Sequence, residues 1–225
     1  MKKTLKVALY ILLALVLIVL AYVIYVFAAY YRVEDMQKLG VAHCDAASAA
    51  PMEGAPQTGV TYRVSSANVG FGAYSADYSF FMDGGKQVRA PSKAVVEKNM
   101  DGIVSTVKDL NADFTFLQEI EADPSTRSYG IEEAERMRTE TGLDTAHARN
   151  YKCAFVPSPI PPIGKVSSGI MTLSTAPIAS AERIALPSPF KWPVSVANLK
   201  RCLMPVYIDL EGTDAQLVLV NLHLE

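Results

Sequence analysis

Hydrophobic positions fall into one long run near the start of the chain, followed by shorter periodic segments. No charged residue occurs from Val7 to Tyr31, where Leu, Val, Ile, Ala and Tyr dominate. A helix of this length extends about 37 Å, enough to cross a hydrocarbon core ~30 Å thick. The run therefore predicts a transmembrane anchor within residues 1–31. A cleaved signal peptide is the alternative, although its apolar region usually spans only ~7–15 residues; a buried helix of a soluble domain is another.

Basic residues on either side of the run predict its orientation. Lys2, Lys3 and Lys6 precede the run, whereas Arg32 and Lys38 follow it beside acidic residues. Lys and Arg are enriched on the cytoplasmic side of membrane proteins. The sequence thus predicts a single-pass protein of the cell membrane, with its N-terminus inside and its C-terminal domain extracytoplasmic.

The next segments predict a linker and the start of a folded domain. Residues 32–59 are rich in Ala, Ser, Gly and Pro and lack a sustained apolar period, which predicts a flexible tether. We expect the folded domain over residues 60–225. Its first strand spans 61–67, and a helix follows Ser92, an expected N-cap, with apolar residues spaced three and four apart as far as Leu110.

The rest of the domain reads as one strand, one helix and then mostly strands. We expect a buried strand over 113–118 and a helix over 131–141, ended by Gly142. Residues 211–214 resemble a hairpin turn. Further strands are predicted at 146–149, 152–156, 169–173, 179–186, 203–210 and 216–222. This order predicts an α/β (α+β) sandwich of two mixed β-sheets flanked by helices.

Charge and cysteine content narrow the function only slightly. The formal net charge of −2 provides no polybasic footprint for tight nucleic-acid binding, but it is compatible with an enzyme that has a small phosphate site. The three cysteines lack the spacing of metal ligands. We expect Cys44 in the tether and Cys153 and Cys202 in strands, as buried thiols rather than as a disulfide framework.

Three polar residues stand where predicted strands end. Glu119 follows the strand 113–118, Asn68 follows the first strand, and His223 follows the last one. A carboxylate and a carboxamide oxygen suit a hard cation such as Mg²⁺, and a histidine can donate to a phosphoryl oxygen or transfer a proton. Each residue also has a structural explanation: a solvated loop glutamate, an Asx turn before glycines, and a histidine satisfied within the fold.

Taken together, the motifs around these residues resemble a known superfamily. Asn68-Val69-Gly70, Leu117-Gln118-Glu119-Ile120 and Asn221-Leu222-His223-Leu224 occur in this order. They are similar to the opening motifs of the endonuclease/exonuclease/phosphatase superfamily, which has the deoxyribonuclease I-like fold. Residues 150–152 and 164–174 resemble its central strands, so the resemblance covers about residues 61–225.

The resemblance implies a role for each matching residue. It implies metal binding by Glu119 and Asn68, and catalytic roles for His223 and Tyr151. Arg201 and Arg127 would bind substrate, although a solvated surface role remains open for both arginines. The implied cofactor is Mg²⁺, with Mn²⁺ or Ca²⁺ as alternatives.

The chain departs from the superfamily pattern after its Asn-x-His motif. Members continue into a Gly-Asp-x-Asn segment and then a Ser-Asp-His segment, which supplies the pair that activates water. No such segments follow in this sequence, and neither His43 nor His147 is a convincing substitute. We therefore expect a fold that is incomplete at the C-terminus and a chain that is inactive by itself.

These observations predict a membrane-anchored, Mg²⁺-dependent hydrolase of phosphoester bonds. Its substrate would be a nucleic acid, a phospholipid or an inositol phosphate, so nuclease, lipid phosphodiesterase and phosphatase activities all remain open. No protein partner is predicted. One alternative is a non-catalytic, degraded homologue that acts as a membrane-tethered binding module; another is a membrane-anchored structural protein whose motifs match by chance.

Overall fold

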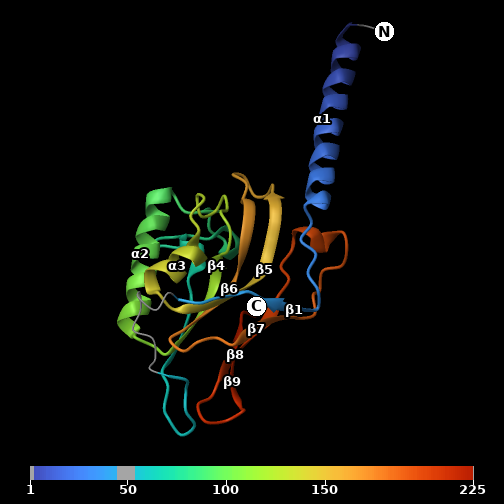
Figure 1. Cartoon of the computed structure of the whole chain (residues 1–225). Coiled ribbons are helices and arrows are strands. Elements are labelled where there is room, and N and C mark those ends of the chain that lie inside the picture. The colour runs from blue at the N-terminus through green and yellow to red at the C-terminus, as the bar shows by residue number, and fades with distance from the viewer. Residues whose placement is uncertain (1–2, 45–53, 225) are drawn as a thin grey trace.

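A computed structural model describes residues 3–44 and 54–224, and its most prominent feature is a helix that projects from a folded domain (Figure 1). This helix, α1 (Lys3–Ala28), is long and apolar enough to cross a membrane, and its most apolar 18-residue stretch is not buried against the rest of the protein. A signal sequence at this position would meet the same criteria of length and composition. The helix therefore agrees with the predicted span without deciding between an anchor and a signal peptide.

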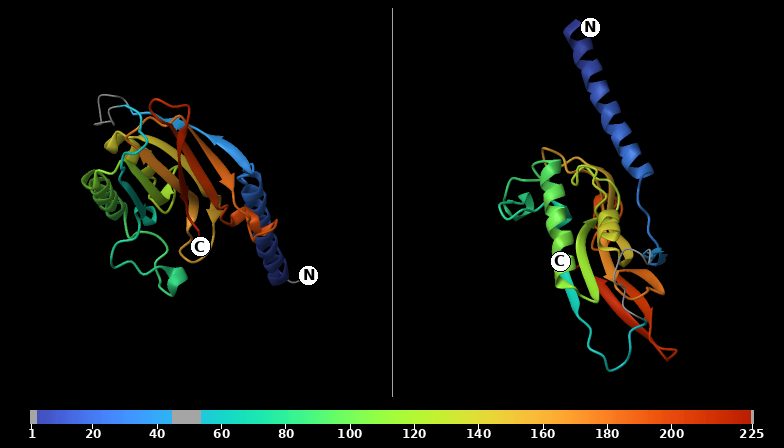
Figure 2. Two further views of the ribbon diagram at one scale, coloured as in Figure 1. Left: turned by 90° about the horizontal axis from the view of Figure 1, so that it is seen from below. Right: turned by 60° about the vertical axis from the view of Figure 1, so that its left-hand side comes forward.

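The domain is built from two sheets packed face to face (Figure 2). The five-stranded sheet has the order β2-β5-β6-β4-β3 and comprises β2 (Val41–Ala42), β3 (Val64–Asn68), β4 (Phe114–Glu121), β5 (Asp144–Val156) and β6 (Gly164–Ser174). The four-stranded sheet has the order β1-β7-β8-β9 and comprises β1 (Met36–Leu39), β7 (Ser180–Ala185), β8 (Cys202–Asp209) and β9 (Gln216–Leu222). The predicted sandwich is confirmed. Only the five-stranded sheet is mixed, because β3 runs parallel to β4, whereas the four-stranded sheet is antiparallel throughout.

Helices α2 (Lys93–Leu110) and α3 (Glu133–Thr141) cover the outer face of the five-stranded sheet (Figure 1). Ser92 caps α2 as predicted, since its hydroxyl accepts the N–H of Val95 at 3.4 Å. The period-3.6 pattern buries one face of α2 against the sheet, through Val96, Met100, Val104 and Val107. Gly142 ends α3 in the left-handed conformation, again as predicted. Short 3₁₀ turns η1 (Gly70–Gly72), η2 (Phe81–Asp83) and η3 (Val194–Ala197) lie in the connections.

Part of the predicted tether is in fact incorporated into the sheets. Strand β1 pairs with β7, and β2 pairs with β5. Asp144 then fixes the chain after β2, because its carboxylate accepts the N–H of Cys44 at 2.8 Å and contacts His43 Nδ1 at 2.7 Å. The flexible-tether prediction is therefore wrong for residues 36–44, where two sheet edges provide backbone partners that the local composition does not reveal. The predicted tether between residues 44 and 54 lies outside the described residues.

Asn221 on β9 links the two sheets through side-chain hydrogen bonds. Its side chain is buried and accepts from Gln118 Nε2 at 3.0 Å, while its own amide donates to the backbone oxygens of Met171 (2.9 Å) and Leu117 (3.3 Å). Because His223 lies two residues further along, this contact sets where that imidazole emerges.

We expect Asn221→Ala to lower the free energy of unfolding by about 1–3 kcal/mol, since it leaves buried polar partners unsatisfied. Thermal unfolding of the purified protein measures the effect. Gln216→Ala is the matched control, because Gln216 lies on the same strand but is exposed, with a hydrogen bond to Asp209. Equal melting temperatures for the two variants would contradict the role of Asn221.

Candidate active site

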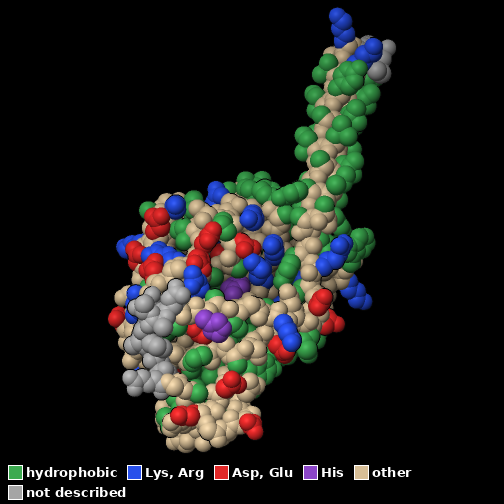
Figure 3. Space-filling model, in the orientation of Figure 1, with side chains coloured by type: hydrophobic (Ala, Val, Ile, Leu, Met, Phe, Trp, Pro, Cys, Tyr) green, Lys and Arg blue, Asp and Glu red, His purple; other side chains and the backbone are tan. Residues whose placement is uncertain are grey.

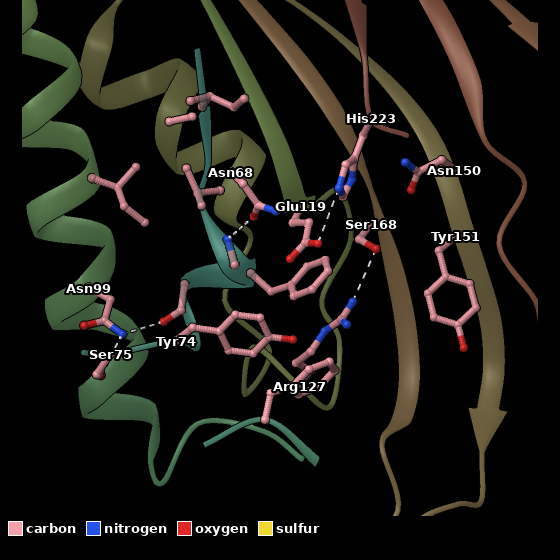
Figure 4. A pocket seen from close by; sticks show the side chains of 18 of the residues that line it. Asn68, Tyr74, Ser75, Asn99, Glu119, Arg127, Asn150, Tyr151, Ser168 and His223 are labelled. Carbon is pink, nitrogen blue, oxygen red and sulfur yellow. Dashed lines mark hydrogen bonds and ion pairs between the residues drawn. The ribbon is translucent and has the colours of Figure 1, made fainter. Parts of the chain in front are cut away.

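All six residues singled out in the sequence line one cavity of about 1220 Å³. The cavity lies between α2, β3 and the loop after β3 on one side and the interior of β4 and β5, with the residue that follows β9, on the other (Figure 4). The six residues are Asn68, Glu119, Arg127, Tyr151, Arg201 and His223. Side chains that are far apart in the sequence and come from both sheets are thus brought together.

Glu119 reaches the cavity through an irregularity inside β4 rather than at the end of a strand. The register of β4 against β6 shifts between Gln118 and Ile120, and Glu119 has a φ of 56°. This left-handed conformation is uncommon for a residue other than glycine, asparagine or aspartate and costs free energy. The bulge turns the Glu119 carboxylate out of the strand's alternation and toward β9, where Oε1 lies 3.7 Å from His223 Nε2.

The contacts of His223 define which ring nitrogen carries its proton. Its Nδ1 lies 3.0 Å from Nη1 of Arg201. A guanidinium can only donate, so Nδ1 must accept, and in the neutral ring the proton sits on Nε2, which faces Glu119. Arg201 therefore orients the imidazole as well as adding positive charge to the cavity.

Asn68 forms the Asx turn that was its structural alternative. Its Oδ1 accepts the N–H of Gly70 at 2.9 Å, and the side chain lies beside Glu119 (Figure 4). Gly70 has a φ of +55°, and a Cβ at that position would lie 2.6 Å from the ring of Tyr74. The glycine is thus required for the tight turn that holds Asn68 at the edge of the cavity. A carbonyl oxygen has two lone pairs, so this turn leaves Oδ1 able to accept a further contact.

The donor set of Glu119 and Asn68 fits a hard cation that keeps most of its ligands as water. The residues at 3–44 and 54–224 contain no group of three or more His, Cys, Asp or Glu suited to a metal. Mg²⁺ is commonly held by one or two carboxylates, with water and substrate phosphate as its remaining ligands. One carboxylate and one carboxamide oxygen at the same cavity wall meet that minimum.

Arg127 is buried rather than solvated, which excludes the surface alternative for this residue. Its Nη2 lies 2.8 Å from Glu121 Oε1, and the guanidinium carbon lies 3.3 Å from the centre of the Phe71 ring. Nη2 also donates to Ser168 Oγ at 3.3 Å. The role of Arg127 in binding substrate stays a prediction. In the structure its guanidinium contacts Glu121, Ser168 and Phe71 and forms part of the floor of the cavity.

A second carboxyl, Glu133, lies beside this ion pair. Its Oε2 accepts the N–H of Glu121 at 3.0 Å, and burial, together with the charge of Glu121, raises its pKa to about 8. Between about pH 4.5 and about pH 8, the Glu133 carboxyl therefore keeps its proton in the folded protein but has lost it in the unfolded chain. The stability that this group contributes is complete below that window and is lost as the pH rises through it.

We expect Glu133→Gln to remove this pH dependence. As the pH rises from about 5 to about 8, the melting temperature of the wild type should fall relative to that of the variant. The reason is that unfolding releases the Glu133 proton in the wild type only. If the melting temperatures of the wild type and the variant changed equally with pH across this range, a buried acid at position 133 would be contradicted.

Tyr151 lies on the opposite wall of the cavity. Its hydroxyl donates to the backbone oxygen of Ala197 at 3.3 Å, and burial raises the pKa of its phenol to about 12. Tyr151 is thus a neutral hydrogen-bond donor at any physiological pH. It follows Asn150, where the register of β5 shifts against β6. Strand β5 continues through this shift, so the two strands predicted at 146–149 and 152–156 are one strand.

The cavity also contains residues that the sequence did not indicate. Asn99 of α2 donates to the backbone oxygen of Gly72 at 2.9 Å and so ties the helix to the turn beside Asn68 (Figure 4). The apolar period of α2 gave no reason to select a residue on its polar side. Ser168 had a signal, since it precedes Gly169 in a motif strand; a Cβ on that glycine would lie only 1.9 Å from Ala148 O.

Comparison with known proteins identifies the fold. No family model matches the chain, and no curated protein matches it. A solved structure described as an endonuclease/exonuclease/phosphatase from Beutenbergia cavernae matches with a TM-score of 0.50 and 22% sequence identity. The match covers 72% of this chain and 38% of that one, so the chain spans well under half of the longer protein. The domain therefore has the α/β sandwich fold of that endonuclease/exonuclease/phosphatase structure.

Proposed function

We propose that the protein is a membrane-anchored, metal-dependent phosphoesterase. The observation that carries this proposal is the approach of Glu119 Oε1 to within 3.7 Å of His223 Nε2 in the cavity that Asn68 also lines. These residues come from β3, β4 and the end of β9, and a sandwich needs no such meeting of polar groups for its stability. The similarity in fold to a phosphatase-type structure supports hydrolysis at a coarse level.

The side chains have complementary tasks at a bound phosphoester. Glu119 and Asn68 would hold Mg²⁺, or Mn²⁺ or Ca²⁺, which when bound neutralises charge on the nonbridging oxygens. His223 Nε2–H would donate to a phosphoryl oxygen, and Arg201 fixes that tautomer through Nδ1. On the far wall, the neutral hydroxyl of Tyr151 would have to turn from the Ala197 oxygen to donate to the phosphoester. Donors that are already oriented where charge develops are the usual source of such catalysis.

Removal of divalent metal tests the proposal. The full-length gene product should hydrolyse bis(p-nitrophenyl) phosphate with added Mg²⁺, lose the activity in EDTA and regain it when Mg²⁺ is restored. Undiminished hydrolysis in EDTA would contradict metal dependence. Parallel assays with single-stranded DNA, a phospholipid and an inositol phosphate distinguish the three proposed substrate classes.

A second candidate is a non-catalytic, membrane-tethered binding module. It is favoured by the small number of acidic ligands, since the described residues contain no larger metal-binding cluster. The two functions predict different results for the same variant: a catalytic site loses turnover when Glu119 is changed, whereas a binding module shows no turnover before or after the change.

We also propose that α1 anchors the protein in the cell membrane with its N-terminus inside. Apart from its C-terminal end, where Val26 packs on the domain, α1 exposes its apolar side chains, and such a surface is stable only in a lipid environment or an assembly. Protease digestion of intact cells, with an epitope at either end of the chain, tests this orientation.

A further inference from the structure

Two apolar segments of the domain lie at the base of α1. One is the tip that connects β5 to β6, residues 155–163, in which Ile160 is 95% exposed. The other spans residues 187–194, and its Trp192 is 70% exposed. We call these two segments the interfacial face. In Figure 3 hydrophobic side chains gather along the edge of the domain nearest to the projecting helix.

Direct contacts connect the interfacial face to α1. The Tyr22 hydroxyl donates to the backbone oxygen of Phe155 at 3.1 Å, and the two rings pack edge to face. Phe27 packs in the same way against Trp192, with ring centres 5.8 Å apart. The tip and the second segment therefore hold α1 from two sides at its C-terminal end, as the ribbons also show (Figure 1).

The length of α1 places these contacts at the edge of a bilayer. Its 26 residues extend about 39 Å, roughly 9 Å more than a hydrocarbon core ~30 Å thick. Tyr22 lies about 9 Å along the helix axis from Ala28. The contact with Phe155 consequently falls where the helix leaves the hydrocarbon, and Ile160 extends beyond Phe155 along the same tip.

The composition of the interfacial face suits lipid headgroups better than water. Residues 155–164 contain no charged residue, and residues 187–194 contain only Lys191. Behind them, cations surround the two tyrosines that follow α1: Lys200 and Arg32 lie over the ring of Tyr30, and Lys152 lies over that of Tyr31. Exposed apolar side chains with interfacial aromatics and a basic border are typical of surfaces that seat on a membrane.

We propose that the interfacial face inserts into the headgroup region of the same bilayer that α1 crosses. This inference depends on α1 being a membrane anchor and not on the proposed chemistry. The domain is then held against the membrane at three points instead of moving freely below a single helix. Ile163, the last residue of the tip, lines the candidate cavity, and so does Ala197, which lies shortly after the second segment, so one wall of the cavity lies next to the lipid surface.

Trp192 is the only tryptophan of the chain and therefore reports on its own surroundings. We expect its fluorescence in full-length protein reconstituted into phosphatidylcholine vesicles to fall by about half when the lipids carry bromine on their acyl chains. The decisive probe is Ile160→Trp in a Trp192→Phe background, because Trp192 packs on Phe27 and would reach the bilayer through the anchor alone. Its emission should be quenched to a similar extent.

Thr213→Trp in the same background is the matched control. Thr213 lies in the turn between β8 and β9, which points away from α1 (Figure 1), and should not be quenched. Equal emission of the Ile160→Trp and Thr213→Trp proteins in brominated vesicles would overturn the proposal. Flotation of the vesicles separates the two ideas: protein that does not float overturns the anchor and this proposal together, whereas flotation without quenching at position 160 overturns this proposal alone.

Discussion

Replacing Glu119 by Gln should lower the rate of phosphodiester hydrolysis by about 100-fold or more, with little change in stability. The substitution keeps the size and hydrogen-bonding shape of the side chain but removes the negative charge that would bind the cation and face His223 Nε2. Glu119 also occupies a left-handed conformation that disfavours most side chains, so its position is maintained against a local cost. Initial rates at saturating Mg²⁺, measured beside the melting temperature, test this expectation.

Glu97→Gln is the matched control for the loss of a carboxylate. Glu97 lies on the exposed surface of α2 and pairs loosely with Lys93 at 3.6 Å, so its loss should change neither rate nor stability appreciably. A Glu119→Gln protein that retains activity within a few-fold of the wild type would refute the proposed role. Glu119→Gly is a second test of this role, because glycine adopts this φ without strain. The Gly variant should be inactive yet at least as stable as the Gln variant.

The parts of the fold that follow from local pattern were predictable. Ser92 and the apolar period after it specify the start and the buried face of α2, and Gly142 specifies the end of α3. By contrast, β1 and β2 are short segments whose stability comes from the edges of β7 and β5. Neither edge can be recognised from the residues that pair with it, so composition alone suggested a flexible linker.

The candidate site was predictable as a set of residues but not as a geometry. Motif similarity selected Glu119 and His223, and the structure brings them together in one cavity. The bulge that aims Glu119 has no signal in Gln118-Glu119-Ile120, because none of these residues favours a positive φ. The sheet-to-sheet contact of Asn221 was equally hidden, since its partners lie 50 to 104 positions away in the sequence.

Arg127 shows why an arginine cannot be assigned from sequence alone, and it yields the largest expected effect on stability. Arg127→Met should lower the free energy of unfolding by about 3–5 kcal/mol, because it leaves Glu121 buried and uncompensated beside Glu133. Glu121 has no exposed side-chain surface, so water cannot replace the lost partner. The thermal midpoint of the purified protein measures the change, and Lys93→Met, which breaks an exposed pair, should have almost no effect.

The double variant Glu121→Gln/Arg127→Met separates an ion pair from a substrate contact. If Arg127 mainly compensates Glu121, removal of both charges should recover much of the stability that the single change loses, because no unpaired charge remains buried. If Arg127 instead binds the phosphoester, the single variant should keep its melting temperature and lose affinity for substrate. Burial of the guanidinium under Phe71 and against Ser168 favours the first outcome, in which Arg127 shapes the floor of the cavity from below.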